Sequence, residues 1–284
     1  MNTNKTKETI KELSISELRP FKRHPYRVVD DEEMDRLAES IEEHGIMTPI
    51  NVRPIEGGYE VISGHRRIHA AKRAGLTTIP AIEMDMTRDQ AAVALVDSNL
   101  HRERLLPSEK AFAYKLKFDA LARQGRRTDL TSDQVGPKLT VDKLSDDDSA
   151  TQVKRYIRLT NLIPPLLRMV DEERIAFTPA VELSYLTQEE QEMLFTEIGV
   201  TLATPSLSQA CRLKKLSGEG KLDEDAIAEI MAEEKLNQKE KVSVPLSALK
   251  GKVPDSYTDR QLQEYVIKAV DHYHRYLMRQ REVR

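Results

Sequence analysis

Segments with strand-forming character are confined to the first hundred residues of this chain and to a short stretch after residue 241. In the first part, three short β-like runs alternate with three helical patterns of apolar spacing. The β-like runs cover residues 50–53, 59–63 and 79–84. The helical patterns cover residues 31–44, 64–74 and 88–99. A proline and two glycines separate the first two runs, which predicts a hairpin and a small mixed sheet within a compact α/β domain.

The sequence between this domain and residue 241 has helical patterns only. A proline and an acidic residue in the first turn predict a long helix from Pro107 to Arg123, and the polar residues 126–138 predict a flexible connection after it. We therefore expect an α+β protein. Its expected parts are a flexible tail (1–9), the α/β domain (10–104), an all-helical domain (105–220), a charged linker (221–240) and a small C-terminal strand and helix module (241–284).

The overall charge says little about partners, because 44 Lys and Arg residues nearly balance 47 Asp and Glu residues. Any nucleic-acid surface must therefore come from local segregation of charge. Cys211 is the only cysteine, which excludes an internal disulfide framework and fits a reducing cytoplasm. No apolar run approaches the length of a membrane span, so we expect a cytoplasmic protein without a membrane partner.

The run Gly64-His65-Arg66-Arg67 places a glycine and two arginines at the start of a predicted helix, directly after a strand. Unpaired N–H groups and a partial positive charge at a helix N-terminus attract anions, and guanidinium groups add bidentate donors. Phosphate is therefore the first ligand to consider at this position. The alternative is that Arg66 and Arg67 only form the solvated face of a surface helix.

The helical middle of the chain carries a local excess of basic residues. Residues 102–127 hold eight basic and three acidic side chains, and residues 150–168 hold four basic and no acidic ones. Ser149 and Gln152 match a capping box, which predicts a helix that starts at Ala150. Preceded by a short element and a turn at residues 141–148, this helix predicts a helix-turn-helix whose second helix enters the major groove of DNA.

Five residues near the start of that second helix are candidate DNA contacts: Thr151, Gln152, Lys154, Arg155 and Arg158. Arg and Gln side chains there can read guanine and adenine edges, whereas Lys154 and Arg158 could equally contact phosphate. Three consecutive aspartates, at 146–148, would repel a phosphate backbone. A basic helix in an ordinary bundle therefore remains the alternative.

Three motifs, in their order and spacing, resemble the ParB/RepB family of chromosome and plasmid partition proteins over residues 10–215. They are Gly64-His65-Arg66-Arg67 with Ala70-Ala71, then Ser98-Asn99-Leu100-His101-Arg102-Glu103, then the helix-turn-helix. The resemblance implies a CTP-gated clamp that binds CTP and Mg²⁺ and loads at a palindromic, centromere-like DNA site. It also implies a ParA-type ATPase partner and a place on the nucleoid or a plasmid. The residues that it assigns to the nucleotide are His24, Arg27, Gly64, His65, Arg66, Arg67, Asn99 and Arg102, with Asn99 also the candidate Mg²⁺ ligand.

This chain departs from the family pattern at several positions. The family commonly has a glutamate linked to hydrolysis where this chain has His65, so CTP hydrolysis is in doubt. A second family glutamate is Ser98 here, and the neighbouring Asp97 is a candidate to help place the metal. The first box reads His24-Pro25-Tyr26-Arg27 instead of the usual glutamine-proline-arginine, and the tail offers lysines instead of an arginine for the partner ATPase.

Three other interpretations stay open. One is a DNA-binding transcriptional regulator or adaptor in which a degenerate nucleotide pocket serves only as structure. A second is a nuclease, with His65 and His69 at i, i+4 spacing as metal ligands. The third is a sulfiredoxin-like enzyme, since the N-terminal fold resembles that family; however, its catalytic loop has no cysteine here, and we expect Cys211 to be a buried core thiol.

The C-terminal segment predicts a dimer interface. An apolar stripe formed by Leu262, Tyr265, Val266, Ala269, Tyr273 and Leu277 follows one face of the last predicted helix, near a predicted strand at residues 242–246. One helix and one strand bury little surface alone, and a second copy would match a palindromic DNA site. We therefore expect a homodimer through residues 241–284. The alternative is that this helix packs back on the middle of the chain.

Overall fold

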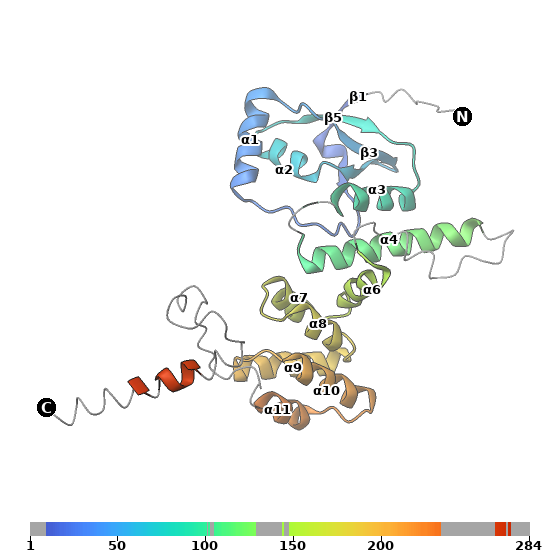
Figure 1. Ribbon diagram of the computed structural model, residues 1–284. Helices are drawn as coiled ribbons and strands as arrows, with labels where there is room; N and C mark the ends of the chain where they lie inside the picture. The colour runs from blue at the N-terminus through green and yellow to red at the C-terminus, as the bar shows by residue number, and fades with distance from the viewer. Residues whose placement is uncertain are drawn as a thin grey trace. The chain divides into compact units, whose positions relative to one another are not determined.

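The computed structural model describes residues 10–100, 102, 105–128, 144, 148–233, 265–270 and 272–273, the side chains of 125–128 excepted (Figure 1). It divides into two units, residues 1–233 and 234–284. Within the described parts of the first unit, a five-stranded mixed sheet precedes a series of helices. The α+β class predicted from the sequence is therefore confirmed.

The sheet has the strand order β1-β5-β3-β4-β2. Its strands are β1 (Ile10–Ser14), β2 (Leu18–Pro20), β3 (Ile50–Ile55), β4 (Gly58–Ser63) and β5 (Thr78–Glu83), and a short 3₁₀ helix, η1 (Ile15–Glu17), joins β1 to β2. The predicted hairpin is β3 and β4, which pair antiparallel, while β3 and β5 pair parallel. The two edge strands, β1 and β2, were missed because they are short and carry exposed polar residues.

Three helices, α1 (Glu32–His44), α2 (His65–Arg73) and α3 (Arg88–Leu100), follow the predicted patterns. Asp31 starts α1 by accepting a hydrogen bond from the backbone N–H of Met34. Figure 1 shows α1 and α2 side by side against the sheet, and both contribute to one buried cluster with strand residues such as Ile50 and Ile79. This packing fixes the N-terminus of α2 against the ends of β3 and β4.

The long helix α4 (Pro107–Thr128) packs along α3 and joins the N-terminal region to the helices that follow. Ala113 and Ala120 of α4 share a buried cluster with Phe21, Tyr26 and residues of α3. Buried side chains from both sides of the domain boundary predicted at residue 105 therefore pack in one hydrophobic cluster. The helix also runs beyond Arg123 into the range predicted as a flexible connection, which was wrong for residues 126–128.

Between residues 148 and 233 the structure describes six further helices: α6 (Ala150–Leu159), α7 (Pro164–Asp171), α8 (Phe177–Leu183), α9 (Gln188–Thr201), α10 (Leu207–Gly218) and α11 (Glu224–Ala232). They surround one hydrophobic core. The predicted linker at 221–240 is wrong for α11, because Ile227, Ile230 and Met231 are buried in that core. Within this helix the acidic residues are Glu224 and Asp225 in the first turn and the exposed Glu229.

Several sequence expectations fall outside the described residues: the tail at 1–9, the first helix-turn-helix element apart from Leu144, and the strand at 242–246. Of the C-terminal stripe, Tyr265, Val266, Ala269 and Tyr273 are described; Val266 is half-buried and the other three are exposed. The described helices include none that is both long enough and apolar enough to cross a membrane. Cys211 is exposed on α10, so the expectation of a buried thiol was wrong.

Candidate functional site

A pocket of about 140 Å³ opens where three segments of the N-terminal region meet. These segments are the loop after β2, the β4 to α2 turn and the end of α3. The lining residues are His24, Tyr26, Arg27, Val28, Ser63, Gly64, His65, Arg66, Arg67, Ser98, Asn99 and Arg102. The structure thus brings together all eight residues that the sequence assigned to a nucleotide site, although they come from three separate stretches of the chain.

Gly64 forms the sharp turn that leads from β4 into α2. Its φ of 105° suits glycine, and a Cβ atom there would lie 2.5 Å from Cγ2 of Ile50. No side chain caps this helix, and its first internal hydrogen bond runs from Ile68 N–H to the Gly64 carbonyl. The N–H groups of the first turn are therefore available to an anion at the pocket.

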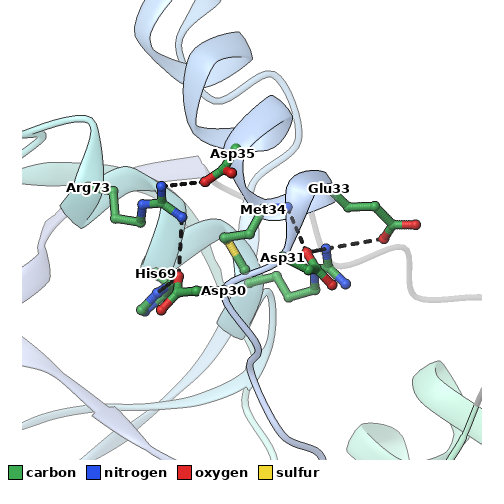
Figure 2. A network of polar contacts seen from close by, with 8 residues as sticks. Asp30, Asp31, Glu33, Met34, Asp35, His69 and Arg73 are labelled. Atoms are coloured by element: carbon green, nitrogen blue, oxygen red, sulfur yellow. Dashed lines mark hydrogen bonds and ion pairs between the residues drawn. The ribbon is translucent and has the colours of Figure 1, made fainter.

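The two arginines of the motif are already engaged with protein acceptors. Arg66 donates to Asp31 (3.4 Å) and Glu33 (3.3 Å) at the start of α1, whose side chains Figure 2 shows next to each other. Arg67 donates to the carbonyls of Thr48 (2.5 Å) and Pro49 (2.6 Å). Burial lowers the pKa of the Arg67 guanidinium. Arg67 therefore stabilises the turn through the two backbone carbonyls. Arg66 is the more exposed of the two, and an anionic ligand could replace its carboxylate partners.

A second polar network joins the other end of α2 to α1 (Figure 2). Asp30 accepts from His69 (2.8 Å) and Arg73 (3.1 Å), and Arg73 also contacts Asp35 (2.5 Å). The hydrogen bond from His69 lowers the pKa of Asp30. His69 thus pairs with Asp30, just before α1, and the described residues contain no group of three or more His, Cys, Asp or Glu side chains that could hold a metal ion. The nuclease interpretation gains no ligand set from this arrangement.

Two histidines from different segments stack inside the pocket. The ring centroids of His24 and His65 lie 3.8 Å apart with their planes inclined by 42°, and Nδ1 of His24 bonds to the carbonyl of Tyr26 (2.8 Å). Burial lowers the pKa of both rings; with the nearby charges of His24 and Arg102 it brings the pKa of His65 to about 3. Both imidazoles are therefore neutral at physiological pH.

Arg27 connects the pocket to helices outside the N-terminal region. Its backbone N–H donates to Glu109 of α4 (2.7 Å), and its guanidinium reaches Asp171 of α7 (3.4 Å). Asp171 also accepts from the N–H (2.9 Å) and hydroxyl (2.7 Å) of Ser108 at the start of α4. Sequence reasoning missed these contacts; Glu109 in the first turn of a proline-initiated helix was the one available signal.

The end of α3 supplies an amide and a guanidinium to the pocket. Asn99 uses its NH₂ group on the Leu95 carbonyl (2.8 Å) and Ser98 hydroxyl (3.1 Å), which leaves its amide oxygen for a ligand. Arg102 lies over the ring of Tyr26, 5.7 Å from its centroid. Asp97 does not join them, because it pairs with Lys117 of α4 (2.6 Å), so the expectation that it helps to place a metal finds no support in its contacts.

The pocket fits the charged end of a nucleotide better than the whole molecule. Its volume is below the roughly 300–1,000 Å³ that encloses most drug-sized ligands. Its lining contains four arginines, two neutral histidines and the first turn of α2, but no carboxylate. Convergent cationic and backbone donors of this kind match the oxygens of a polyphosphate.

The second candidate site is the first half of α6. Ser149 caps this helix by accepting from Gln152 N–H, although Gln152 contacts Arg155 (3.3 Å) instead of completing the predicted reciprocal bond. Thr151 and Lys154 are exposed. Arg155, in contrast, donates to the hydroxyl of Thr178 (2.9 Å) and lies over the ring of Phe177 in α8.

Arg158 is also directed toward the protein. Its guanidinium carbon lies 3.8 Å from the ring centroid of Tyr185, and Nζ of Lys214 lies 3.7 Å from the same centroid. The Nε atom of Arg158 is buried and without a hydrogen-bond partner in the described structure. Of the five candidate DNA contacts, Thr151 and Lys154 are thus the exposed ones, while Gln152, Arg155 and Arg158 are half-buried.

Asp148, the last residue of the acidic turn before α6, would repel a phosphate backbone less than the sequence suggested. Asp148 pairs with Lys110 of α4 (2.6 Å) and accepts a short hydrogen bond from the hydroxyl of Tyr114. Burial alone would raise the pKa of Asp148, but the hydrogen bonds from Lys110 and Tyr114 lower it overall. This carboxylate fastens the start of α6 to α4.

Comparison with known proteins gives consistent matches. The ParB N-terminal domain family matches residues 1–100. Stage 0 sporulation protein J of Bacillus subtilis is 34% identical over 167 residues, which cover 59% of this chain and 54% of that protein. The probable chromosome 1-partitioning protein ParB of Deinococcus radiodurans is 30% identical over 209 residues, 74% of this chain and 67% of that protein. The chain thus spans about half to two thirds of the length of these curated relatives.

Among solved structures, two of the C-terminally truncated chromosome-partitioning protein ParB from Caulobacter crescentus are similar in part. The one complexed with CTP-gamma-S is 25% identical with a TM-score of 0.31, covering 62% of this chain and 92% of that chain. The one complexed to the centromeric parS site is 22% identical with a TM-score of 0.40, covering 72% and 98%.

Proposed function

This chain belongs to the ParB family of partition proteins, and we propose that it binds CTP in the N-terminal pocket and a palindromic DNA site through α6. In this role it would act as a nucleotide-gated DNA clamp in the segregation of a chromosome, plasmid or mobile element, and it would be associated with the nucleoid or plasmid.

The single observation that supports nucleotide binding most strongly is the convergence of three sequence motifs on one pocket. His24 and Arg27, the Gly64 to Arg67 run, and Asn99 with Arg102 are separated in the sequence yet line the same cavity. The uncapped first turn of α2 adds backbone donors. A triphosphate needs several cationic and N–H donors around its oxygens, and this set supplies both kinds.

A magnesium ion would have to be held largely by the nucleotide itself. The only protein oxygen among the predicted site side chains is the amide oxygen of Asn99, and the lining contains no carboxylate. Mg²⁺ commonly uses one or two protein ligands together with phosphate oxygens and water. The lining holds no carboxylate that could act as a general base, so this proposal covers nucleotide binding alone and assigns no hydrolytic residue.

For DNA binding we propose that α6 is the second helix of a helix-turn-helix. Ser149 defines its start, and the exposed Thr151 and Lys154 lie in its first turns, where such helices contact base edges and phosphates. Arg155 holds the helix against Phe177 of α8, and Arg158 holds it against Tyr185 in the turn that follows α8. We therefore assign direct contact to Thr151 and Lys154, and positioning to the two arginines.

Helix α4 offers a physical connection between the two proposed sites. On the nucleotide side, Lys117 pairs with Asp97, two residues before Asn99, and Glu109 holds the backbone of Arg27. On the DNA side, Lys117 donates to the carbonyl of Leu144 (3.0 Å), and Lys110 pairs with Asp148. A shift of α4 would therefore change both sites, and the two binding equilibria would be coupled reciprocally.

The nucleotide proposal is tested by titrating the protein with CTP and Mg²⁺ in a calorimeter. We expect Arg66→Ala to weaken binding about tenfold, because it removes a cation from the pocket. Arg73→Ala is the matched control: Arg73 lies on the same helix and also pairs with α1 carboxylates, but it is outside the pocket lining. Equal affinity of the wild-type and Arg66→Ala proteins, or no binding by either, would refute the proposal.

We also propose a homodimer through residues 241–284 and a ParA-type ATPase partner, as the sequence resemblance implies. The test of the dimer is sedimentation of a chain that ends at Glu233, because α11 is part of the helical core and must be kept. Without nucleotide, the shortened chain is expected to be a monomer. A dimer of unchanged affinity would reject this assignment.

One observation favours a second candidate function, a DNA-binding regulator or adaptor whose pocket is structural. Arg66 and Arg67 already have protein acceptors in the absence of any ligand. If this function applies, the protein binds its DNA site with the same affinity at all CTP concentrations. A change of DNA affinity with CTP supports the clamp instead.

A further inference from the structure

Tyr185, in the turn that follows α8, has cations from two other helices against its ring. The guanidinium carbon of Arg158 in α6 lies 3.8 Å from the ring centroid, and Nζ of Lys214 in α10 lies 3.7 Å from it. Helix α8 packs against both α6 and α10. Each cation is attracted by the ring, but two positive charges this close repel each other, so the arrangement favours a nearby anion.

The protein supplies only part of that negative charge. In the described part of the chain, Glu182 is the one carboxylate that pairs with this group, through Nζ of Lys214 at 2.8 Å. Arg158 is held by the ring instead, and its Nε is buried without a hydrogen-bond partner among the described residues. Two cations against one carboxylate leave one positive charge at Tyr185.

This group continues the basic surface that Lys154 begins. Lys154 and Arg158 are four residues apart in α6, so their side chains project from the same face of the helix, one turn apart. Lys154 is exposed, Tyr185 is 46% exposed, and the side chain of Lys214 is 38% exposed. A large anion that contacts Lys154 can therefore extend along this face to Tyr185 and Lys214.

We propose that Tyr185 and Lys214 contact the phosphate backbone of DNA beside α6. The inference rests on the proposed DNA-binding function of α6 and extends it to residues outside the helix-turn-helix. Lys214 supplies the charge, the Tyr185 hydroxyl donates to a phosphate oxygen, and Arg158 positions the ring. Phosphates carry no sequence information, so this contact strengthens binding to DNA of any sequence.

Titration of the protein with a labelled DNA duplex of random sequence, at several salt concentrations, tests this contact. Lys214→Gln keeps a long polar side chain and removes the charge, so we expect binding about three- to tenfold weaker and a salt dependence reduced by about one phosphate contact. Glu182→Gln removes the carboxylate that competes for Lys214, so we expect the opposite sign, binding about threefold tighter.

Tyr185→Phe separates the hydroxyl from the ring. It keeps the aromatic face for both cations and removes only the donor, and we expect binding about threefold weaker, the effect of losing one hydrogen bond. Lys215→Gln is the matched control for Lys214→Gln. It removes the same charge from an exposed neighbour on α10 whose side chain points about 100° away around the helix, and we expect it to keep the wild-type salt dependence.

The gain of affinity expected for Glu182→Gln guards against a folding defect, because a misfolded variant would bind more weakly. Equal effects of Lys214→Gln and Lys215→Gln, or no gain in Glu182→Gln, would overturn this inference. The proposal for α6 would still stand if Lys154→Ala lowers the salt dependence. If the wild type binds no duplex even at low salt, the inference and the α6 proposal both fail.

Discussion

The first turns of α2 and α6 are the two candidate binding surfaces, and they are built in opposite ways. Helix α2 begins at Gly64 without a side-chain cap, so its N–H groups are open to the pocket. Helix α6 begins at Ser149, whose hydroxyl accepts the N–H of Gln152. Each helix contributes one buried side-chain atom without a hydrogen-bond partner among the described residues: Nε2 of His65, a residue that lines the pocket, and Nε of Arg158, whose guanidinium lies over Tyr185.

This difference shows how the same residue type acquires different roles. An uncapped helix start surrounded by basic residues can receive an anion between its own backbone donors. The cap of α6 occupies one of the N–H donors of its first turn, so the side chains that project away from the packed face carry more of any contact there. In α6 the arginines are used to hold the helix on α8, and the exposed Lys154 is left for a partner. Exposure and pairing therefore separate binding residues from positioning residues better than charge does.

The largest expected effect concerns the turn that opens α2. Gly64→Ala would force a Cβ atom to within 2.5 Å of Ile50 at a φ of 105°, so we expect the free energy of unfolding to fall by roughly 3 kcal/mol. Gly199→Ala is the control, since nothing lies within 4 Å of its Cβ position and alanine favours a helix. Urea denaturation of both variants measures the difference. Similar stabilities would mean that the turn is not constrained as described.

The second prediction concerns the pH dependence of stability. The pKa of His65 is about 3 in the folded protein and 6.5 in the reference state, so the unfolded chain binds more protons between these values. Stability from the neutral ring is therefore complete above pH 6.5 and is lost as the pH falls, by about 2 kcal/mol at pH 5. His65→Gln should lack this loss.

Urea denaturation of the wild type and of His65→Gln at pH 7 and at pH 5 measures this loss. It is the change with pH in the difference between the unfolding free energies of the two proteins. His24, whose pKa is also lowered by burial, faces the same ring and is present in both. A difference that does not change with pH would show that His65 is not held neutral by its surroundings.

The third prediction compares neighbouring residues of α6. Arg155→Ala removes the bond to Thr178 and the contact with Phe177, and we expect a loss of about 1 kcal/mol of unfolding free energy with equal weakening of specific and random DNA. Lys154→Ala should leave stability within about 0.5 kcal/mol and lower the salt dependence of DNA binding by about one phosphate contact.

Thermal denaturation and DNA titrations at several salt concentrations distinguish the two variants. If Arg155→Ala instead weakens specific DNA alone, then Arg155 reads bases directly and the assignment of a positioning role is wrong.

The smallest expected effect concerns the contact that draws Arg27 away from the pocket. Asp171→Asn keeps an oxygen that can accept from Ser108 N–H but removes the charge that faces Arg27 at 3.4 Å. We expect CTP affinity to rise about threefold, a small change because the Arg27 side chain is largely exposed and its 3.4 Å ion pair is therefore weak. Asp223→Asn, which alters the cap of α11, is the control. Unchanged or weaker CTP binding by Asp171→Asn would show that Asp171 does not compete for Arg27.

The sequence predicted local features well and side-chain partners poorly. Helix spacing, Pro107 and the positive-φ glycines located α1 to α4 within a few residues, because these signals act within one or two turns. All eight residues that the motifs assigned to the nucleotide also line the pocket. Sequence patterns could not show that Arg66 pairs with α1 or that Arg155 packs on α8, since those partners are distant in sequence.

The capping box at Ser149 shows the same limit on a small scale. Complete boxes form at Thr187 and Ser206, whereas Gln152 turns to Arg155. The acidic run after residue 221 was misjudged for a related reason. Its charges mark a linker only if the apolar residues between them stay exposed, and in α11 these residues are buried by α9 and α10.

The most direct test of the comparison is hydrogen exchange of the backbone amides in the two first turns, with CTP and Mg²⁺ added to the wild-type protein without DNA. The structure predicts slower exchange at residues 65–67, where the nucleotide would occupy the uncapped N–H groups, and little change at residues 151–153. Unchanged exchange at 65–67 under conditions where CTP is bound would contradict the central claim that the start of α2 is the phosphate site.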